Sequence, residues 1–179
     1  MKIAIIGFSG SGKTSTATKI SKHYQLPVMH LDDVHFDYYW NERALNITKS
    51  EVKTFIDDNS KWVIEGNYFD LNDDQRFEGA DLILILRFNR FYCFKRALLR
   101  QLKSYFIKGV FGDKQRPRFD FSFINWILFK GRMTRYTRDY ERIEKNFHKK
   151  CVVFKDKKQL ETYLDNLLYN NSINDYVSY

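Results

Sequence analysis

The amino-acid sequence predicts an α/β fold in which five parallel β-strands form one sheet with helices on both faces. Short apolar runs, typical of strands buried on both sides, alternate with longer segments of helical periodicity. A glycine-rich turn joins the first apolar run to the first helical segment. Such alternation is typical of strand–helix–strand units, so we expect a three-layer fold within a single domain of residues 1–168.

The first strand is predicted at Lys2–Ile6, and the first helix from Gly12 to about His23. Between them the chain reads Gly-Phe-Ser-Gly-Ser-Gly-Lys-Thr, and strand, glycine loop and helix are the context in which GxxxxGK[ST] forms a phosphate-binding loop, or P-loop. Its backbone N–H groups and the positive end of the helix would face one anion, whereas the alternative is an ordinary glycine turn. The predicted nucleotide-binding residues are Gly7, Ser9, Gly10, Ser11, Gly12, Lys13, Thr14 and Ser15.

Carboxylates follow the second predicted strand, Pro27–Leu31. Ligands of open α/β sheets bind at the carboxyl ends of strands, where Asp32 and Asp33 stand. In a P-loop enzyme Lys13 neutralises the β- and γ-phosphates of ATP or GTP, and the Thr14 hydroxyl binds Mg²⁺. We expect Asp32 to be catalytic and to hold Mg²⁺ directly or through water, with Asp33 contacting the acceptor. The alternative is a helix cap or an Asx turn.

Aromatic and polar residues near these strand ends are candidates for the acceptor site. The cluster of Phe36, Tyr38, Tyr39 and Trp40 could stack on a ring of the acceptor, or could form a satellite core. Gly66 follows the third predicted strand, Trp62–Glu65, and permits close backbone approach, so Asn67 and Tyr68 are candidate acceptor contacts. We expect no metal site from His30 and His35, which flank the aspartate pair.

Apolar periodicity and turn residues predict the remaining elements. They are a helix at Lys49–Asp58 with Thr48 as N-cap, a loop at Asp70–Gly79, a strand at Leu82–Leu86, a helix at Phe91–Phe106, a helical region at Phe121–Phe147 interrupted near Gly131, a strand at Cys151–Phe154, a helix at Leu160–Leu168 and a frayed tail at residues 169–179. Two cysteines are too few for a disulfide scaffold and are expected to pack in the core of a protein from a reducing compartment.

Charge is unevenly distributed along the chain. The net charge of +8 combines −4 for residues 1–86, +15 for residues 87–158 and −3 for residues 159–179. Arg96 and Arg100 share one helix face and suit phosphate oxygens, and Arg116 lies in a glycine- and proline-containing loop of a closing lid at about residues 109–135. The basic block could also bind nucleic acid weakly and nonspecifically, or could be a set of solvated helix faces.

The strand Leu82–Leu86 ends at Arg87, where a P-loop enzyme often places its Mg²⁺-binding carboxylate. This position therefore leaves Asp32 and Asp33 as the carboxylates for the metal. No apolar run approaches the roughly 18 residues that a membrane helix needs, and too few apolar residues precede the loop to form a signal peptide. We expect a soluble cytoplasmic protein that binds no membrane.

With these elements in place, the chain resembles the adenylate-kinase-like P-loop kinases and, more narrowly, the DNA topology modulation proteins related to FlaR. The resemblance spans roughly residues 1–165 and is carried by residues 5–14, 28–32 and 62–68, by Arg90, Arg96 and Arg100, and by residues 123–126. It implies a five-stranded parallel sheet, ATP with Mg²⁺ and phosphoryl transfer to a small acceptor. It also implies that Arg96, Arg100 and Arg116 neutralise the transferring group. The family's usual Leu-Asp-Phe-Pro is Leu86-Arg87-Phe88-Asn89 here.

These observations favour an ATP-dependent kinase acting on a small molecule or a nucleotide. Two alternatives remain at this level: an ATP-binding protein associated with nucleic acid, and a nucleotide-binding regulator without catalysis. The first alternative follows from the basic block interleaved with aromatic residues. The second follows from the missing acid after Leu86.

Overall fold

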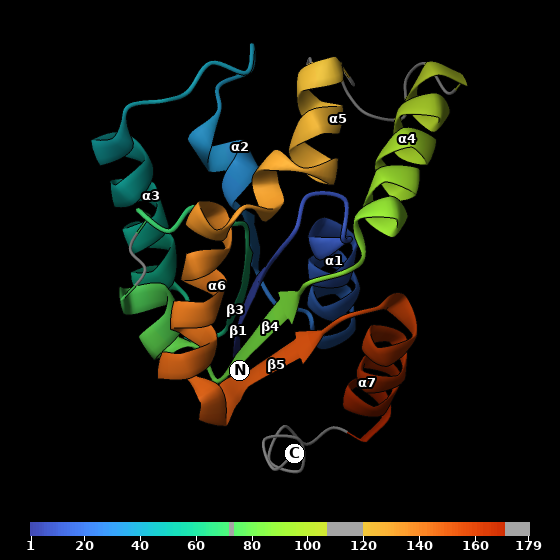
Figure 1. Cartoon of the computed structure of the whole chain (residues 1–179). Coiled ribbons are helices and arrows are strands. Elements are labelled where there is room, and N and C mark those ends of the chain that lie inside the picture. Colours follow the sequence, from blue (N-terminus) through green and yellow to red (C-terminus); the bar gives the residue numbers. More distant parts are fainter. Residues whose placement is uncertain (72–73, 107–119, 171–179) are drawn as a thin grey trace.

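The computed structural model describes residues 1–71, 74–106 and 120–170. Five parallel strands form one sheet in the order β2-β3-β1-β4-β5, which confirms the predicted fold class. The strands are β1 (Lys2–Gly7), β2 (Val28–His30), β3 (Trp62–Glu65), β4 (Leu82–Leu86) and β5 (Cys151–Phe154). Since all five run in the same direction, their carboxyl ends meet at one edge of the sheet, where the loop after β1 also lies (Figure 1).

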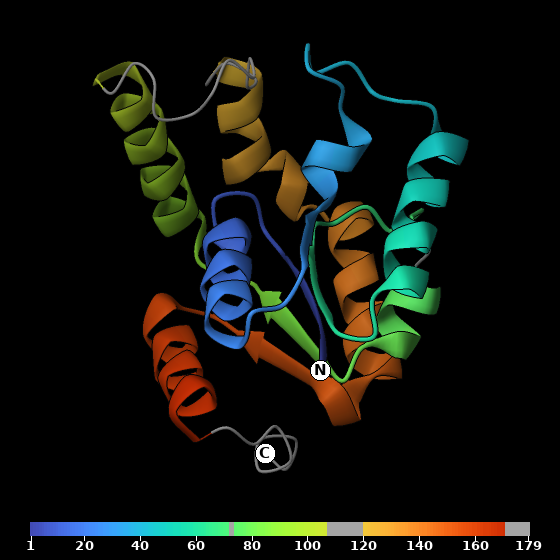
Figure 2. The same ribbon diagram turned by 180° about the vertical axis from the view of Figure 1, so that it is seen from behind.

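Helices cover both faces of this sheet. Figure 2 shows α1 (Lys13–Tyr24) and α7 (Lys157–Asn170) on one face, joined by the hydrogen bond from Tyr24 to Leu167 O. The opposite face carries α3 (Leu45–Asp58), the π-helical turn η1 (Asp74–Glu78) and α6 (Thr134–Asn146) (Figure 1). The remaining elements are α2 (Leu31–His35), α4 (Arg90–Phe106), α5 (Phe121–Leu128), η2 (Lys130–Arg132) and η3 (His148–Lys150).

The core lies between these layers and is centred on the two middle strands. Residues 3–6 of β1 and 82–86 of β4 are fully buried, as expected for strands covered on both faces. Trp62, Phe77 and Phe88 add fully buried aromatic rings. Cys93 is buried and Cys151 partly buried, and both are free thiols.

Several element boundaries differ from the sequence prediction. Thr48 is not an N-cap: α3 begins at Leu45, and the buried Thr48 hydroxyl donates to Leu45 O inside the helix. Leu31 opens α2 instead of closing β2, and η1 occupies part of the expected loop at Asp70–Gly79. The last helix runs to Asn170, so Tyr169 and Asn170 are helical, and residues 171–179 lie outside the described part. Of the expected lid, residues 109–119 also lie outside it, whereas residues 120–135 include α5 and η2.

Candidate functional site

The glycine loop lies between β1 and α1, with its backbone held in conformations that require glycine. Gly12 has φ +105° and is the N-cap of α1, and Gly10 has φ +79°. A Cβ atom on Gly10 would lie 2.4 Å from Cys93 O, and one on Gly12 would lie 2.3 Å from Arg96 Nη1. The loop therefore packs against the α4 backbone at Gly10 and against the Arg96 side chain at Gly12, with no room for a side chain of its own at either position.

Lys13 lies along the inside of this loop. Its Nζ donates to Gly7 O at 3.0 Å and to Phe8 O at 3.4 Å. Burial lowers the pKa of Lys13, and the carboxylates of Glu65 and Asp32 oppose that effect. The ammonium group is thus placed between the loop and the two carboxylates, as the predicted phosphate-binding role requires.

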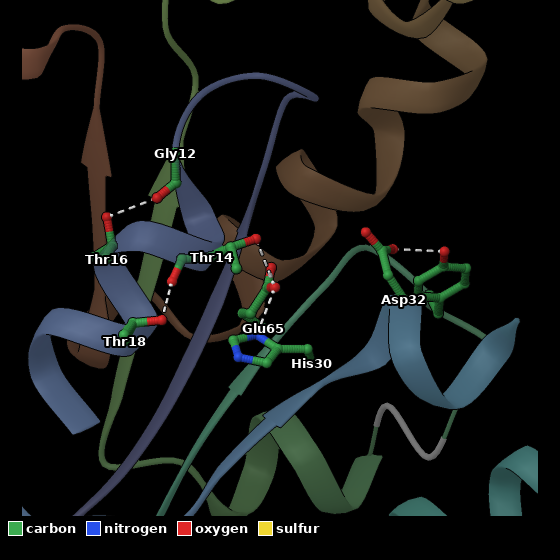
Figure 3. Close-up of polar contacts among 8 residues, drawn as sticks. Gly12, Thr14, Thr16, Thr18, His30, Asp32 and Glu65 are labelled. Atoms are coloured by element: carbon green, nitrogen blue, oxygen red, sulfur yellow. Dashed lines mark hydrogen bonds and ion pairs between the residues drawn. The ribbon is translucent and has the colours of Figure 1, made fainter. Parts of the chain in front are cut away.

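A carboxylate that the sequence reasoning did not select stands beside Thr14. The Thr14 hydroxyl donates to Glu65 Oε1 at 2.9 Å, and His30 Nδ1 lies 2.9 Å from the same oxygen (Figure 3). Glu65 ends β3 and is 3% exposed. The hydrogen bond to Glu65 raises the pKa of His30. The sequence does show an acid at the last position of an apolar strand. It indicates a residue beside the glycine loop only once β3 is known to be the neighbour of β1.

Asp32 lies in the first turn of α2, across from Thr14 and Glu65 (Figure 3). Its Oδ1 accepts a hydrogen bond of 2.7 Å from the Tyr68 hydroxyl. Burial, followed by the Asp32 charge, raises the pKa of the Tyr68 phenol. Asp32 is exposed and is not bonded to Thr14, so the oxygen beside Thr14 is that of Glu65. Asp33, next in α2, is also exposed.

Gly66 and Asn67 tie the end of β3 to the glycine loop. Gly66 N donates to Ile5 O at 3.1 Å, and the Asn67 carboxamide accepts from Gly7 N at 2.9 Å and donates to Gly7 O at 2.7 Å. Both polar atoms of the Asn67 side chain are therefore hydrogen-bonded to the loop. The prediction that Asn67 and Gly66 contact the acceptor stays a prediction.

Arg76 of η1 lies behind the same segment and is 1% exposed. Its guanidinium donates to Gly66 O at 3.2 Å and to Tyr68 O at 3.3 Å, and it lies over the Phe77 ring. A buried arginine is unusual because removing its charge from water is costly. Arg76 thus fixes the backbone on both sides of Asn67, a role that its polar surroundings in the sequence did not predict.

Arg96 reaches the loop from α4. Its guanidinium donates to Ser11 O at 3.3 Å and to Ser15 Oγ at 3.4 Å. Arg100, one turn further along α4, is exposed and contributes a small lowering of the Lys13 pKa through its charge. Arg96 thus contacts the loop, and the role of Arg96 and Arg100 toward a phosphate stays a prediction, whereas Arg116 lies outside the described residues.

The segment from α5 to η2 also contacts the loop. Trp126 Nε1 donates to Ser9 Oγ at 3.3 Å, and Arg132 lies 4.0 Å above the Phe8 ring. Arg132 also donates to Phe88 O and Ile127 O, both at 3.0 Å, and burial lowers its pKa. The alternative of a solvated helix face therefore does not hold for Arg132. Its contacts join elements distant in sequence, and no local pattern indicates them.

Two positions singled out in the sequence remain: Trp40, a candidate acceptor contact, and Arg87, which stands where an acid was sought. Trp40 has φ +64°, and its ring lies 5.0 Å from that of Phe36, whose centroid is 6.4 Å from that of Tyr68. Arg87, at the end of β4, pairs with Glu144 at 3.5 Å and Glu141 at 4.0 Å on α6. The position where an acid was sought is thus part of an ion pair that joins the sheet to a helix.

Comparisons with known proteins place this geometry in a fold family. No protein-family model and no curated protein matches the sequence. Among solved structures, shikimate kinase from Acinetobacter baumannii, in complex with shikimate, is 11% identical with a TM-score of 0.58, covering 96% of this chain and 94% of that chain. The chain has the fold of shikimate kinase. A candidate kinase from Chloroflexus aurantiacus is 14% identical with a TM-score of 0.48, covering 72% of this chain and 79% of that chain.

Two features are absent from the residues that the structure describes. No three His, Cys, Asp or Glu side chains gather as a ready-made metal site. None of the helices there is long and apolar enough to cross a membrane.

Proposed function

We propose that the chain is an ATP-dependent phosphotransferase that transfers the γ-phosphoryl group to a hydroxyl group of a small acceptor. The observation that carries this proposal is the bond between the Thr14 hydroxyl and the buried Glu65 carboxylate, next to Lys13 in the glycine loop. The fold shared with shikimate kinase supports it, because the phosphate loop, β3 and α2 converge at the carboxyl edge of the sheet.

The residues present fit both a triphosphate and a magnesium ion. The loop offers backbone N–H groups at a helix N-terminus, and the buried Ser11 hydroxyl has no partner among the described residues. Mg²⁺ is commonly held by one or two carboxylates together with phosphate oxygens and water, so a cluster of three protein ligands is unnecessary. Glu65 and Thr14 would hold the ion, which would polarise the γ-phosphate, and Asp32 could act on it only through water.

Other side chains have separate roles in the proposed transfer. Lys13 and Arg96 stabilise negative charge on the phosphates, since the chemistry depends mainly on positioning and charge. Tyr68 fixes one oxygen of Asp32, which leaves the other to accept the proton of the acceptor hydroxyl. The hydroxyl oxygen forms the new bond to the γ-phosphorus, the bond to the β–γ bridging oxygen breaks, and ADP leaves.

Nucleic-acid binding remains a proposal of lower rank. Several cations of the basic block contact protein groups, namely Arg87, Arg96, Arg132 and Lys150. The exposed residues Arg135 and Arg138 on α6 are better placed to meet a polyanion. This binding would be electrostatic and salt-dependent.

The proposed function is tested by measuring Mg²⁺-dependent ATP hydrolysis and ATP affinity in Glu65→Gln. Loss of one electrostatic group at a reacting phosphate costs about 10²–10³-fold in rate, and we expect that loss with ATP affinity reduced by about tenfold or less. Glu161→Gln, which removes a surface charge paired with Lys157, is the control and should behave as the parent protein. Unchanged hydrolysis in Glu65→Gln would refute the assignment of Glu65.

A further inference from the structure

We propose that the phosphoryl acceptor is a hydroxyl compound that carries a protonated amine, such as an amino alcohol or an amino sugar. This inference rests on the proposed function and names its substrate class. The acceptor would contact side chains at the ends of β2 and β3, which we call the acceptor cluster: Asp32, His35, Phe36, Trp40 and Tyr68.

The segments that carry the acceptor cluster are rich in carboxylates. Residues 30–42 contain three aspartates and one glutamate, residues 62–71 contain one of each, and neither segment contains a lysine or an arginine. Asp32, Glu65 and Glu42 all act on the Tyr68 hydroxyl through their charges. A second anion would be repelled here, whereas a cation would be attracted.

The arginines that contact these segments are bound to protein groups. Arg43 donates to Val34 O at 2.9 Å and forms a bidentate ion pair with Glu51. Arg76 faces the carbonyl groups of Gly66 and Tyr68. In the part of the chain that the structure describes, neither arginine is therefore placed to pair with a carboxylate or phosphate on an acceptor.

The acceptor cluster also contains aromatic rings that pack close to its carboxylate. The His35 ring lies 4.4 Å from the Tyr68 ring at an interplanar angle of 35°, and the Phe36 ring lies 5.0 Å from that of Trp40. Ring faces attract ammonium groups, and an adjacent carboxylate strengthens that preference. Aromatic rings beside carboxylates thus suit an amine better than an acid.

Two buried polar atoms of the cluster provide an observation independent of its acids. His35 Nδ1 and Trp40 Nε1 have no hydrogen-bond partner among the described residues. In the tautomer that carries its proton on Nε2, His35 Nδ1 is an acceptor for an amine N–H. The Trp40 indole is a donor that a hydroxyl oxygen would satisfy, and its residue is held at φ +64°, where non-glycine residues are uncommon. Buried polar groups normally have partners, and groups of an acceptor would supply them at these two atoms.

The test uses acceptors matched in shape and different in charge. Transfer of label from γ-³²P-ATP with Mg²⁺ at neutral pH is measured for glucosamine, glucose and glucuronate, and for 3-amino-1,2-propanediol, glycerol and glycerate. In at least one set we expect the amine to exceed the neutral compound in kcat/KM by about fivefold, as one partly screened charge pair provides, with the acid lowest. The proposal would be overturned if an acid were the preferred acceptor of either set, or if the three compounds of a reacting set had equal rates. It would also be overturned if neither amine accepted the label.

Charge variants give the matched control. Asp33→Asn and Glu42→Gln should each reduce the preference for the amine by about threefold, whereas Asp58→Asn, an exposed change at the end of α3, should leave it unchanged. Calorimetry with Mg²⁺ and ATP distinguishes failure of the proposed substrate class from failure of the proposed function. If ATP binds and is hydrolysed but an acid is the preferred acceptor, the substrate class is wrong and the proposed function stands. If ATP does not bind, both fail.

Discussion

The Asn67 side chain forms two hydrogen bonds with the backbone of Gly7, one through its oxygen at 2.9 Å and one through its nitrogen at 2.7 Å. Gly7 is the last residue of β1, and Asn67 follows the end of β3 by two residues. The carboxamide therefore continues the pairing of the two strands by one step into the glycine loop. This links the position of the phosphate loop to the segment that carries Glu65 and Tyr68.

Replacing Asn67 tests this link. Asn67→Ala should lower the free energy of unfolding by about 2 kcal/mol, because it leaves the Gly7 N–H without a partner and removes one of the two bonds to Gly7 O, the other being that from Lys13. We expect ATP affinity to fall as well, because the loop loses its attachment. Denaturant unfolding and calorimetry measure the two effects. Asn59→Ala, which removes a single bond to Phe55 O, is the control for stability and should leave ATP affinity unchanged.

Arg76 should behave as a structural support of the same segment. Arg76→Met removes the bonds to Gly66 O and Tyr68 O and should destabilise the protein by about 2–4 kcal/mol. Arg76→Lys keeps one charged donor and should lose less. Thermal or denaturant unfolding of the two variants checks this order, and equal stability of Arg76→Met and the parent would contradict it.

His30 should make stability depend on pH in Mg²⁺-free buffer. The hydrogen bond to Glu65 raises the pKa of His30 above its ordinary value of 6.5. A raised folded-state pKa stabilises below the unfolded value, and that contribution is lost as pH rises through the folded value. The loss of Tm in His30→Gln should therefore be larger at about pH 5.5 than at about pH 9. His23→Gln, on the exposed side of α1, is the comparison, and a loss independent of pH would exclude the ion pair.

The basic block should show whether nucleic acid is a partner. If it is, fluorescence anisotropy of a labelled DNA duplex should report affinity that falls by about tenfold or more between about 50 and 200 mM salt. Arg135→Ala combined with Arg138→Ala should weaken binding further, since both side chains are exposed on α6. A signal that is flat over this salt range would remove nucleic acid as a partner.

Much of the fold could be predicted because its determinants are local. Continuous apolar runs predicted the five strands, and a strand followed by glycines and a helix predicted the loop that Lys13 lines. The N-cap prediction at Thr48 failed for a physical reason. A threonine hydroxyl can bond a carbonyl within a helix as readily as it caps one, and here it donates to Leu45 O.

The site was predicted less completely because it depends on strand order. An acid was sought after β4, where Arg87 instead pairs with Glu144. β1 lies between β3 and β4, so either neighbour could place a carboxylate beside the loop, and the one hydrogen-bonded to Thr14 is Glu65 of β3. The contacts of Trp126 with Ser9 and of Arg132 with Phe8 join residues more than 100 positions apart, which no periodicity reveals.

In the proposed function, the glycine loop binds the phosphates of ATP, and Glu65 with Thr14 holds the Mg²⁺ ion. Isothermal titration of the parent protein and Lys13→Ala with ATP, in the presence and absence of Mg²⁺, tests it most directly. We expect binding to the parent that Mg²⁺ strengthens, and a loss of about tenfold or more in Lys13→Ala, because the ammonium group that would contact the phosphates is removed. No heat with the parent protein, or equal affinity in Lys13→Ala, would contradict the claim.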